Sequence, residues 1–311
     1  MKVLVAGGAG FIGSHLCEKL LKNGCDVTIV DNLITGRKKN ISGLTGIHFV
    51  EANINETQTF ALPALSVKFD HIYNLASPAS PVDFPKMPIF ILETATHGHK
   101  NLLELARRCS ARILFASSSE VYGDAEIHPQ IESYFGNVNS FGVRSCYDEA
   151  KRVGETLSLG YKKEYGIAIR IARIFNTYGP RMRPSDGRII PNFFSQALQG
   201  QALSIFGDGK QTRSFCYVSD LVDGLFLLMQ SNVETPTNLG NPIERSVLEI
   251  AEQIKALTSS ASLLEFLPLG ENDPKQRRPD ISKARELLKY DPRIDLETGL
   301  KNSLTYFSSE A

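Results

Sequence analysis

A cluster of glycines between an apolar run and a helical pattern constrains the fold of this chain more than any other feature. The run KVLVA at residues 2–6 predicts a buried strand, and residues 14–22, which follow the glycines, predict a helix. A second short apolar run, VTIVD at residues 27–31, predicts another strand. Strand, glycine turn, helix and strand within about 30 residues are typical of the βαβ unit that binds a dinucleotide.

The glycines fit two spacings that serve the same purpose. Gly7, Gly10 and Gly13 fit G-x-x-G-x-x-G, while Gly8 with the last two fits G-x-G-x-x-G. Either spacing allows a tight turn, lets the backbone approach a pyrophosphate, and directs a helix N-terminus at it. A glycine motif alone is weak evidence, but its position between a predicted strand and a predicted helix indicates a dinucleotide site.

Asp31, at the end of the second predicted strand, indicates which dinucleotide is bound. A carboxylate there can accept hydrogen bonds from the adenosine ribose hydroxyls and would repel a 2′-phosphate, which favours NAD over NADP. Arg37, Lys38 and Lys39 lie nearby and could offset that repulsion. A solvated basic loop is the simpler interpretation of these three cations.

Strands and helices continue to alternate over the first half of the chain. Further strands are predicted at residues 47–51, 71–76, 112–117 and 168–175, with helices at 87–108 and 145–165. This alternation predicts an α/β fold with a Rossmann-type, doubly wound parallel sheet. Right-handed crossovers place the strand ends at one edge of such a sheet, where ligands bind.

The alternation ends after Asn176. The Pro- and Gly-rich segment 178–184 predicts a crossing to a second portion of the fold. Shorter helices are predicted beyond it, at residues 191–199, 218–230, 247–257 and 283–290. We expect a smaller α+β C-terminal portion that covers the edge of the sheet.

Tyr147 and Lys151 lie four residues apart in the helix predicted at residues 145–165, so they share one helix face. A phenol is a poor base at neutral pH because its pKa is near 10, and a cationic neighbour lowers that pKa. Lowering it by about three units needs roughly 4 kcal/mol, which one ammonium about 4 Å away supplies at an effective dielectric of about 20. The pair could therefore form a tyrosinate that removes a hydroxyl proton, although the same spacing often arises by chance in amphipathic helices.

Composition argues against several classes of partner. The chain of 311 residues has 34 Lys and Arg and 34 Asp and Glu, so no net basic charge indicates nucleic acid. Its five scattered cysteines contain no Cys-x-x-Cys, which argues against a disulfide framework or a zinc site and favours a reducing compartment. No signal peptide is visible, and no apolar stretch approaches the roughly 20 residues that cross a bilayer. We expect a cytoplasmic protein that binds neither nucleic acid nor a membrane.

Several segments together resemble a known superfamily. The glycine turn, Asp31-Asn32, SSEVYG at residues 118–123 and Tyr147-x-x-x-Lys151 resemble the extended short-chain dehydrogenases/reductases that act on nucleotide sugars. Within that superfamily, longer segments resemble the UDP-glucuronate decarboxylases, also called UDP-xylose synthases. These segments are LASPASP at 75–81, SSSEVYGD at 117–124, RSCYDE at 144–149, RIFNTYGPRM at 173–182, GDGKQTRSF at 207–215 and RRPD at 277–280.

Ser119 and Glu120 distinguish among the activities of this superfamily. The 4,6-dehydratases have Asp-Glu at this place, where the Asp protonates a departing hydroxyl, and the 4-epimerases usually have a small or hydroxyl residue in place of Glu120. A Ser-Glu pair combined with Arg277 resembles the decarboxylases. The alternatives are a nucleotide-sugar 4-epimerase, a 4,6-dehydratase, and a non-catalytic NAD-binding sensor.

The resemblance implies NAD-dependent decarboxylation of UDP-glucuronate to UDP-xylose through a UDP-4-keto intermediate, with NAD regenerated and without a metal. It implies that Tyr147 removes the 4-hydroxyl proton, that Lys151 stabilises the phenolate, and that a hydroxyl of the serine run, assigned to Ser119, hydrogen-bonds the enolate. Glu120 would repel the substrate carboxylate, and Arg277 could bind that carboxylate bidentately. The alternatives are a turn cap or an arginine partner for Glu120, and a surface salt bridge for Arg277.

The resemblance also implies the remaining site residues. With Tyr147 and Lys151, the NAD-binding residues would be Gly7, Gly10, Phe11, Ile12, Gly13, Asp31, Asn32, Thr35, Gly36, Asn53, Ile54, Leu75, Ala76, Ser77, Thr94, Ala116, Thr177 and Arg188. The UDP-sugar would be bound by Asn101, Arg108, Asn176, Arg213, Tyr217 and Arg277. Some positions near the two ligands depart from the usual residues of the family, namely Asn53, Glu93, Ala95 and His99.

The family also implies a domain division and an assembly. Residues 1–176 would bind NAD, with 212–240 returning to this portion, and residues 177–211 and 241–311 would bind the nucleotide sugar. A homodimer would form through the helices predicted at 87–108 and 145–165. His97 and His99 diverge on the first of these helices, so a shared metal ion is not expected.

Overall fold

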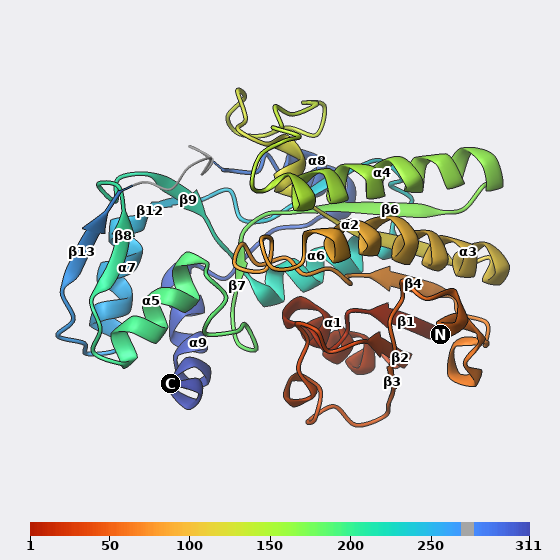
Figure 1. Ribbon diagram of the computed structural model, residues 1–311, viewed down its shortest axis with the longest axis horizontal. Coiled ribbons are helices and arrows are strands. Elements are labelled where there is room, and N and C mark those ends of the chain that lie inside the picture. Colours follow the sequence, from red (N-terminus) through yellow and green to blue (C-terminus); the bar gives the residue numbers. More distant parts are fainter. Residues whose placement is uncertain (269–276) are drawn as a thin grey trace.

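A seven-stranded parallel sheet forms the centre of the computed structural model, which describes residues 1–268 and 277–311 (Figure 1). The strands lie in the order β11-β6-β5-β4-β1-β2-β3, which confirms the doubly wound α/β fold. Their bounds are β1 (Lys2–Ala6), β2 (Asp26–Asp31), β3 (Ile47–Glu51), β4 (His71–Asn74), β5 (Arg112–Ser118), β6 (Ile169–Ile174) and β11 (Thr237–Leu239).

Alternating side chains along the strands build a hydrophobic core on each face of the sheet. In β1, Val3 and Val5 pack on one face with α1 (Phe11–Lys22) and α6 (Val218–Gln230). Leu4 points to the other face, where α3 (His99–Cys109) and α4 (Ser145–Tyr165) pack. Because the sheet is covered on both faces, apolar side chains occupy both faces of β1.

The helix predicted at residues 87–108 is interrupted. It consists of α2 (Pro88–Glu93), a π-helical turn η4 (Thr94–Gly98) and α3. At Gly98 an added Cβ would lie 2.6 Å from the side-chain oxygen of Asn55, so only glycine permits this close approach. Periodicity could not show this irregularity, because the apolar spacing continues through it.

The smaller portion lies beside the carboxyl edge of the sheet, on the left in Figure 1. Its core contains Phe193, Phe194 and Phe307, which are buried. Its helices are α5 (Ile189–Leu198), α7 (Val247–Leu257) and α9 (Leu296–Glu310). Two-stranded sheets pair β8 (Leu203–Phe206) with β13 (Leu264–Leu267), and β9 (Thr212–Ser214) with β12 (Glu244–Ser246). The remaining elements are β7 (Thr177–Tyr178), β10 (Cys216–Tyr217) and α8 (Ser282–Leu288).

The C-terminal helix α9 was absent from the sequence prediction. Asp295 caps it by accepting a hydrogen bond from the Thr298 backbone N–H, and Leu300 and Phe307 bury its apolar face. The cap and the apolar spacing were both visible in the sequence. Near the end of the helix, Glu310 contacts the sheet portion by forming ion pairs with Arg37 and Lys39.

Within the segment 212–240, α6 and β11 belong to the sheet portion, whereas β9 pairs outside it. The proposed division into two portions stays a prediction. The five cysteines are free and buried. No helix among residues 1–268 and 277–311 is both long and apolar enough to cross a membrane.

Candidate active site

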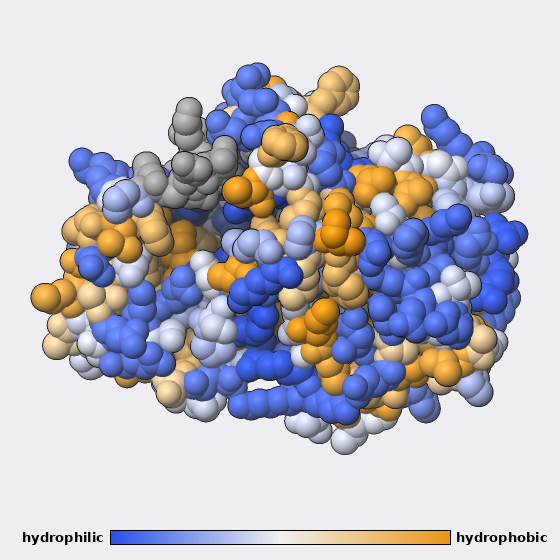
Figure 2. Space-filling view, in the orientation of Figure 1, coloured by the Kyte–Doolittle hydropathy of each residue, from blue (hydrophilic) through white to orange (hydrophobic). Residues whose placement is uncertain are grey.

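A pocket lies where the carboxyl ends of the sheet strands face the smaller portion. The turn after β1, Asp31 at the end of β2, and the residues that follow β4, β5 and β6 all line it. In Figure 2, hydrophilic surface separates the sheet portion from the smaller portion, with hydrophobic patches beside it. The strand ends therefore converge on one site, as a doubly wound sheet requires.

The glycine turn after β1 fits a dinucleotide. Gly7 has a φ of +79°, and a Cβ at Gly13 would lie 2.1 Å from the Gly7 carbonyl oxygen. No side chain of the described residues caps the N-terminus of α1, so none of them supplies an acceptor to its first backbone N–H groups beside the pocket. A helix N-terminus of this kind attracts an anion such as a pyrophosphate.

Asp31 is buried and organises the loops around it. Its carboxylate accepts hydrogen bonds from the backbone N–H groups of Ala9 (3.0 Å) and Leu33 (2.8 Å), while burial raises its pKa. A Cβ at Gly36 would lie 2.7 Å from this carboxylate, which explains the need for glycine there. The carboxylate stands at the strand end that contacts an adenosine ribose in this class of site.

The cations of the basic loop near Asp31 form ion pairs with carboxylates, and the side chains of Lys38 and Lys39 are largely exposed, as a solvated basic loop would have them. Arg37 forms an ion pair with Glu310 at 2.9 Å, and Lys39 binds the same carboxylate. Lys38 binds Glu51 at 2.7 Å. Each of the three cations already has a carboxylate partner. None of them is therefore a cation without a counter-charge that would favour binding of a 2′-phosphate.

Tyr147 and Lys151 are buried on the face of α4 that lines the pocket. The Lys151 ammonium lies 5.3 Å from the centre of the Tyr147 ring and donates a 2.9 Å hydrogen bond to the Ala116 carbonyl oxygen. Burial lowers the pKa of Lys151 to about 8. Burial also raises the pKa of Tyr147, while the Ser118 hydroxyl and the charges of Arg188 and Arg144 oppose that rise, so the shift is opposite to the lowering expected from the sequence.

Ser118 is the serine that contacts Tyr147. The two hydroxyls are hydrogen-bonded, and this bond opposes the rise in the tyrosine pKa. Ser117 instead donates to Glu155 at 2.6 Å, while Ser119 is buried and lines the pocket. The assignment of a serine hydroxyl to the enolate, made to Ser119 from the sequence, stays a prediction, and the structure adds the contact of Ser118 with the phenol. Strand periodicity could not decide between them, because β5 passes into a 3₁₀ turn, η5 (Ser119–Tyr122), at this point.

Glu120 binds two arginines. One carboxylate oxygen pairs with Arg277, and the other accepts a 2.9 Å hydrogen bond from Arg144. Arg277 is buried and lines the pocket, so it does not form the surface salt bridge considered above. Its Nη2 is buried and has no hydrogen-bond partner in the part of the chain that the structure describes, which leaves a donor available for a ligand.

Two side chains that the sequence prediction missed complete this wall of the pocket. Phe84 stacks on Tyr147, with ring centroids 4.8 Å apart and planes 15° apart. The Arg144 guanidinium lies 5.5 Å from the centre of the Phe84 ring. Arg144 therefore links Glu120 to the aromatic pair, a relation that no local sequence signal revealed.

All the residues predicted to bind NAD line the pocket. Of the residues predicted for the UDP-sugar, Asn176, Arg213 and Arg277 also line it. Arg213 is buried and donates a 2.9 Å hydrogen bond to the Thr212 carbonyl oxygen.

Three other residues predicted for the UDP-sugar do not line the described pocket. Asn101 donates a 2.9 Å hydrogen bond to the Ile54 carbonyl oxygen, and Arg108 is exposed on α3. Tyr217 packs edge-on against Tyr178, with ring centroids 5.6 Å apart. A direct contact from these three to a ligand in this pocket is therefore not supported.

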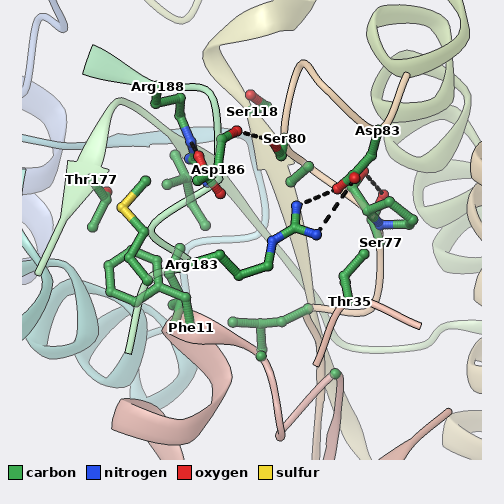
Figure 3. A pocket seen from close by; sticks show the side chains of 18 of the residues that line it. Phe11, Thr35, Ser77, Ser80, Asp83, Ser118, Thr177, Arg183, Asp186 and Arg188 are labelled. Atoms are coloured by element: carbon green, nitrogen blue, oxygen red, sulfur yellow. Dashed lines mark hydrogen bonds and ion pairs between the residues drawn. The ribbon is translucent and has the colours of Figure 1, made fainter. Parts of the chain in front are cut away.

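Two further arginines, Arg183 and Arg188, line the side of the pocket formed by residues 183–188 (Figure 3). Arg183 forms an ion pair with Asp83, and Arg188 forms one with Asp186. Ser80 donates a hydrogen bond to the Asp186 carbonyl oxygen, which joins the two loops that carry these residues.

His99 is buried within the protein, and its ring nitrogens lie 3.0 Å from the Asn74 amide nitrogen and 2.8 Å from the Ser158 hydroxyl. His97 is exposed, so the two histidines diverge as predicted. No cluster of metal-ligating side chains occurs among the described residues.

Comparison with known proteins agrees with this geometry. Residues 3–240 match the model of the "NAD dependent epimerase/dehydratase family". The chain is 52% identical over 309 residues to UDP-glucuronic acid decarboxylase 1 of Danio rerio, covering 99% of this chain and 73% of that protein. It is 50% identical over 304 residues to UDP-glucuronic acid decarboxylase 3 of Arabidopsis thaliana, covering 96% and 87%.

Solved structures are also similar. UDP-glucose 4-epimerase of Thermotoga maritima, solved with UDP-glucose, has a TM-score of 0.93 and 29% identity, covering 99% of each chain. UDP-glucuronic acid 4-epimerase of Bacillus cereus, solved with UDP-glucuronic acid and NAD, has a TM-score of 0.88 and 30% identity, again covering 99% of each chain. These matches confirm the resemblance inferred from the sequence: the chain belongs to the NAD dependent epimerase/dehydratase family, in which it is similar to the UDP-glucuronic acid decarboxylases.

Proposed function

We propose that this protein decarboxylates UDP-glucuronate to UDP-xylose, with NAD as a regenerated cofactor. The observation that carries the proposal is the pairing of Glu120 with Arg277 in the same pocket as Tyr147 and Lys151. The similar proteins named UDP-glucuronic acid decarboxylase support this substrate and this product class. Bound NAD would accept the C4 hydride of the sugar and later return it, which makes a transient 4-ketone.

Each side chain has a role that its surroundings support. Tyr147 removes the 4-hydroxyl proton, assisted by the hydrogen bond from Ser118 that favours the phenolate. Lys151 stabilises the phenolate charge from its position 5.3 Å from the ring centre. A ketone at C4 makes the sugar acid a β-keto acid, so carbon dioxide can leave as an enolate forms, and C5 of this enolate then takes up a proton. The hydroxyls of Tyr147 and Ser118 hydrogen-bond the enolate oxygen.

Arg277 receives the substrate carboxylate through Nη2, which has no partner among the described residues. Arg144 already binds the second oxygen of the Glu120 carboxylate. It therefore still balances the negative charge of Glu120 when Arg277 binds the substrate. Asn176 and Arg213, which both line the pocket, support binding of the UDP moiety. The homodimer and the cytoplasmic location stay predictions.

Product analysis tests the proposal. The purified protein is incubated with UDP-glucuronate and NAD, and the nucleotide product is analysed by mass spectrometry together with released carbon dioxide. We expect a UDP-pentose that is lighter than the substrate by one carbon dioxide. An unchanged mass with inverted C4 configuration would instead identify a 4-epimerase, the activity named for one similar structure.

A further inference from the structure

The side chain of Arg183 crosses the part of the pocket that is lined by residues predicted to bind NAD. Figure 3 shows it extended toward Asp83, with Phe11 and Thr35 on one side and Ser80 on the other. Phe11 belongs to the start of α1, and Thr35 follows β2, so both come from the dinucleotide-binding unit. The guanidinium therefore lies over the part of the pocket that faces the glycine turn.

Asp83 fixes this position. It is buried, and its carboxylate oxygens contact the two terminal nitrogens of Arg183, one of them at 3.5 Å. The Asp83 carbonyl oxygen accepts hydrogen bonds from the backbone N–H groups of Lys86 and Met87, both at 3.1 Å, so the acid is itself held in place. A guanidinium has five N–H donors, and this pair leaves several of them available.

The loop that carries Arg183 is anchored to both sides of the pocket. On the α1 side, His15 contacts the Pro180 carbonyl oxygen at 2.9 Å, and Glu18 pairs with Arg181 at 2.7 Å. On the opposite side, Ser80 donates to the Asp186 carbonyl oxygen. The loop thus holds a cation across the pocket opposite an anion-binding helix N-terminus.

A pyrophosphate carries two negative charges, and a helix N-terminus supplies only about half a positive charge. Arg181 and Arg188 also line the pocket and pair with Glu18 and Asp186, just as Arg183 pairs with Asp83, so it is the extension of Arg183 across the pocket that singles it out. We propose that Arg183 is a cofactor-binding residue whose guanidinium, held across the pocket by Asp83, donates to the pyrophosphate of the dinucleotide. This inference rests on the proposed NAD site and extends it to a residue outside the glycine unit.

Ligand fragments test the proposal without any turnover. Binding of ADP-ribose, which contains the pyrophosphate, and of adenosine, which lacks it, is measured by competition with NADH fluorescence. Arg183→Met is expected to weaken ADP-ribose binding about tenfold to a hundredfold, the usual effect of losing a charge-assisted hydrogen bond, and to leave adenosine binding unchanged. Arg183→Lys is expected to recover part of the loss, because it keeps the charge without the planar fork.

Ser80→Ala is the matched control, since it removes the other contact between the two loops without removing a cation. It is expected to weaken both ligands slightly and equally. Equal loss of ADP-ribose affinity in Ser80→Ala and Arg183→Met would mean that only loop closure matters, and would overturn the proposal. Full ADP-ribose binding by Arg183→Met would overturn it as well. Failure of the natural protein to bind ADP-ribose would instead remove the NAD site itself, and this inference with it.

Discussion

Glu120 and Arg277 form a buried ion pair, and Arg144 occupies the second oxygen of the same carboxylate. Burial lowers the pKa of Arg277 to about 10, so this arginine still carries its charge at neutral pH. The pair joins the turn after β5 to a residue 157 positions later in the chain. It therefore links the sheet portion to the second half of the chain at the site itself.

The first prediction is that removing the charge of Glu120 destabilises the protein more than removing Arg277. Glu120→Gln leaves a buried cation without its charge partner and is expected to lower the free energy of unfolding by about 3 kcal/mol. Arg277→Met is expected to cost less, because Glu120 stays paired with Arg144. Urea unfolding of the ligand-free variants measures both changes. The double variant Glu120→Gln, Arg277→Met should be more stable than Glu120→Gln alone, and a less stable double variant would contradict the explanation.

The second prediction distinguishes Ser118 from Ser119. The hydrogen bond from Ser118 lowers the pKa of Tyr147, so Ser118→Ala raises that pKa. If the phenolate is the base, the acidic limb of the kcat/KM profile then moves to higher pH, and activity near pH 7 falls about tenfold or more. Ser119→Ala leaves this hydrogen bond in place, and its acidic limb is expected to stay where it is in the natural protein.

Equal displacement of the acidic limb in the two serine variants would mean that Ser118 has no special effect on the tyrosine base. An unchanged limb in both variants would mean that the Ser118 contact does not tune the base. Binding of NAD, measured separately, should be the same in both variants, so that a change in affinity is not mistaken for a change in the base.

The third prediction uses two glycines of α4 that have opposite surroundings. A Cβ at Gly154 would lie 2.1 Å from the Phe115 ring, whereas a Cβ at Gly160 would meet nothing within 4 Å. Gly154→Ala is therefore expected to destabilise the fold by about 3 kcal/mol, through overpacking against a buried ring. Gly160→Ala is expected to stabilise it by about 0.5–1 kcal/mol, because alanine loses less backbone entropy in a helix.

Thermal unfolding of the two variants provides the measurement. Both substitutions replace a glycine by alanine in the same helix. Unfolding temperatures that shift in opposite directions would therefore isolate the effect of the Phe115 contact. Equal shifts would show that α4 can move away from β5, which the close packing of Gly154 argues against.

The sequence predicted what depends on local signals and missed what depends on long-range contacts. The glycine turn, Asp31 and the Tyr147–Lys151 spacing are local, and all of these residues line the pocket. The Arg183–Asp83 pair joins residues 100 positions apart, and no periodic pattern can reveal such a contact. The pKa of Tyr147 is raised rather than lowered, because burial, which raises it, is a property of the whole fold. The helix α9 did have an adequate local signal, its N-terminal cap and apolar spacing, which the sequence prediction did not use.

The fourth prediction concerns His99, which lies in the core between Asn74 and Ser158. Burial, and to a lesser extent the charge of Lys151, lower its pKa from 6.5 to about 3. Between these two values the unfolded chain binds a proton that the folded protein does not, so stability falls as the pH decreases below 6.5. From about pH 7 to about pH 5 this group alone should remove about 2 kcal/mol of the free energy of unfolding.

His99→Gln removes the titration while keeping a polar side chain at the site. Its free energy of unfolding, measured by urea at both pH values, should therefore decrease by about 2 kcal/mol less than that of the natural protein. His97→Gln is the matched control, because it makes the same substitution at an exposed position two residues away. If His99→Gln and the natural protein lost the same stability on acidification, His99 would have to be protonated in the folded core, and the hydrogen bonds to Asn74 and Ser158 would need another explanation.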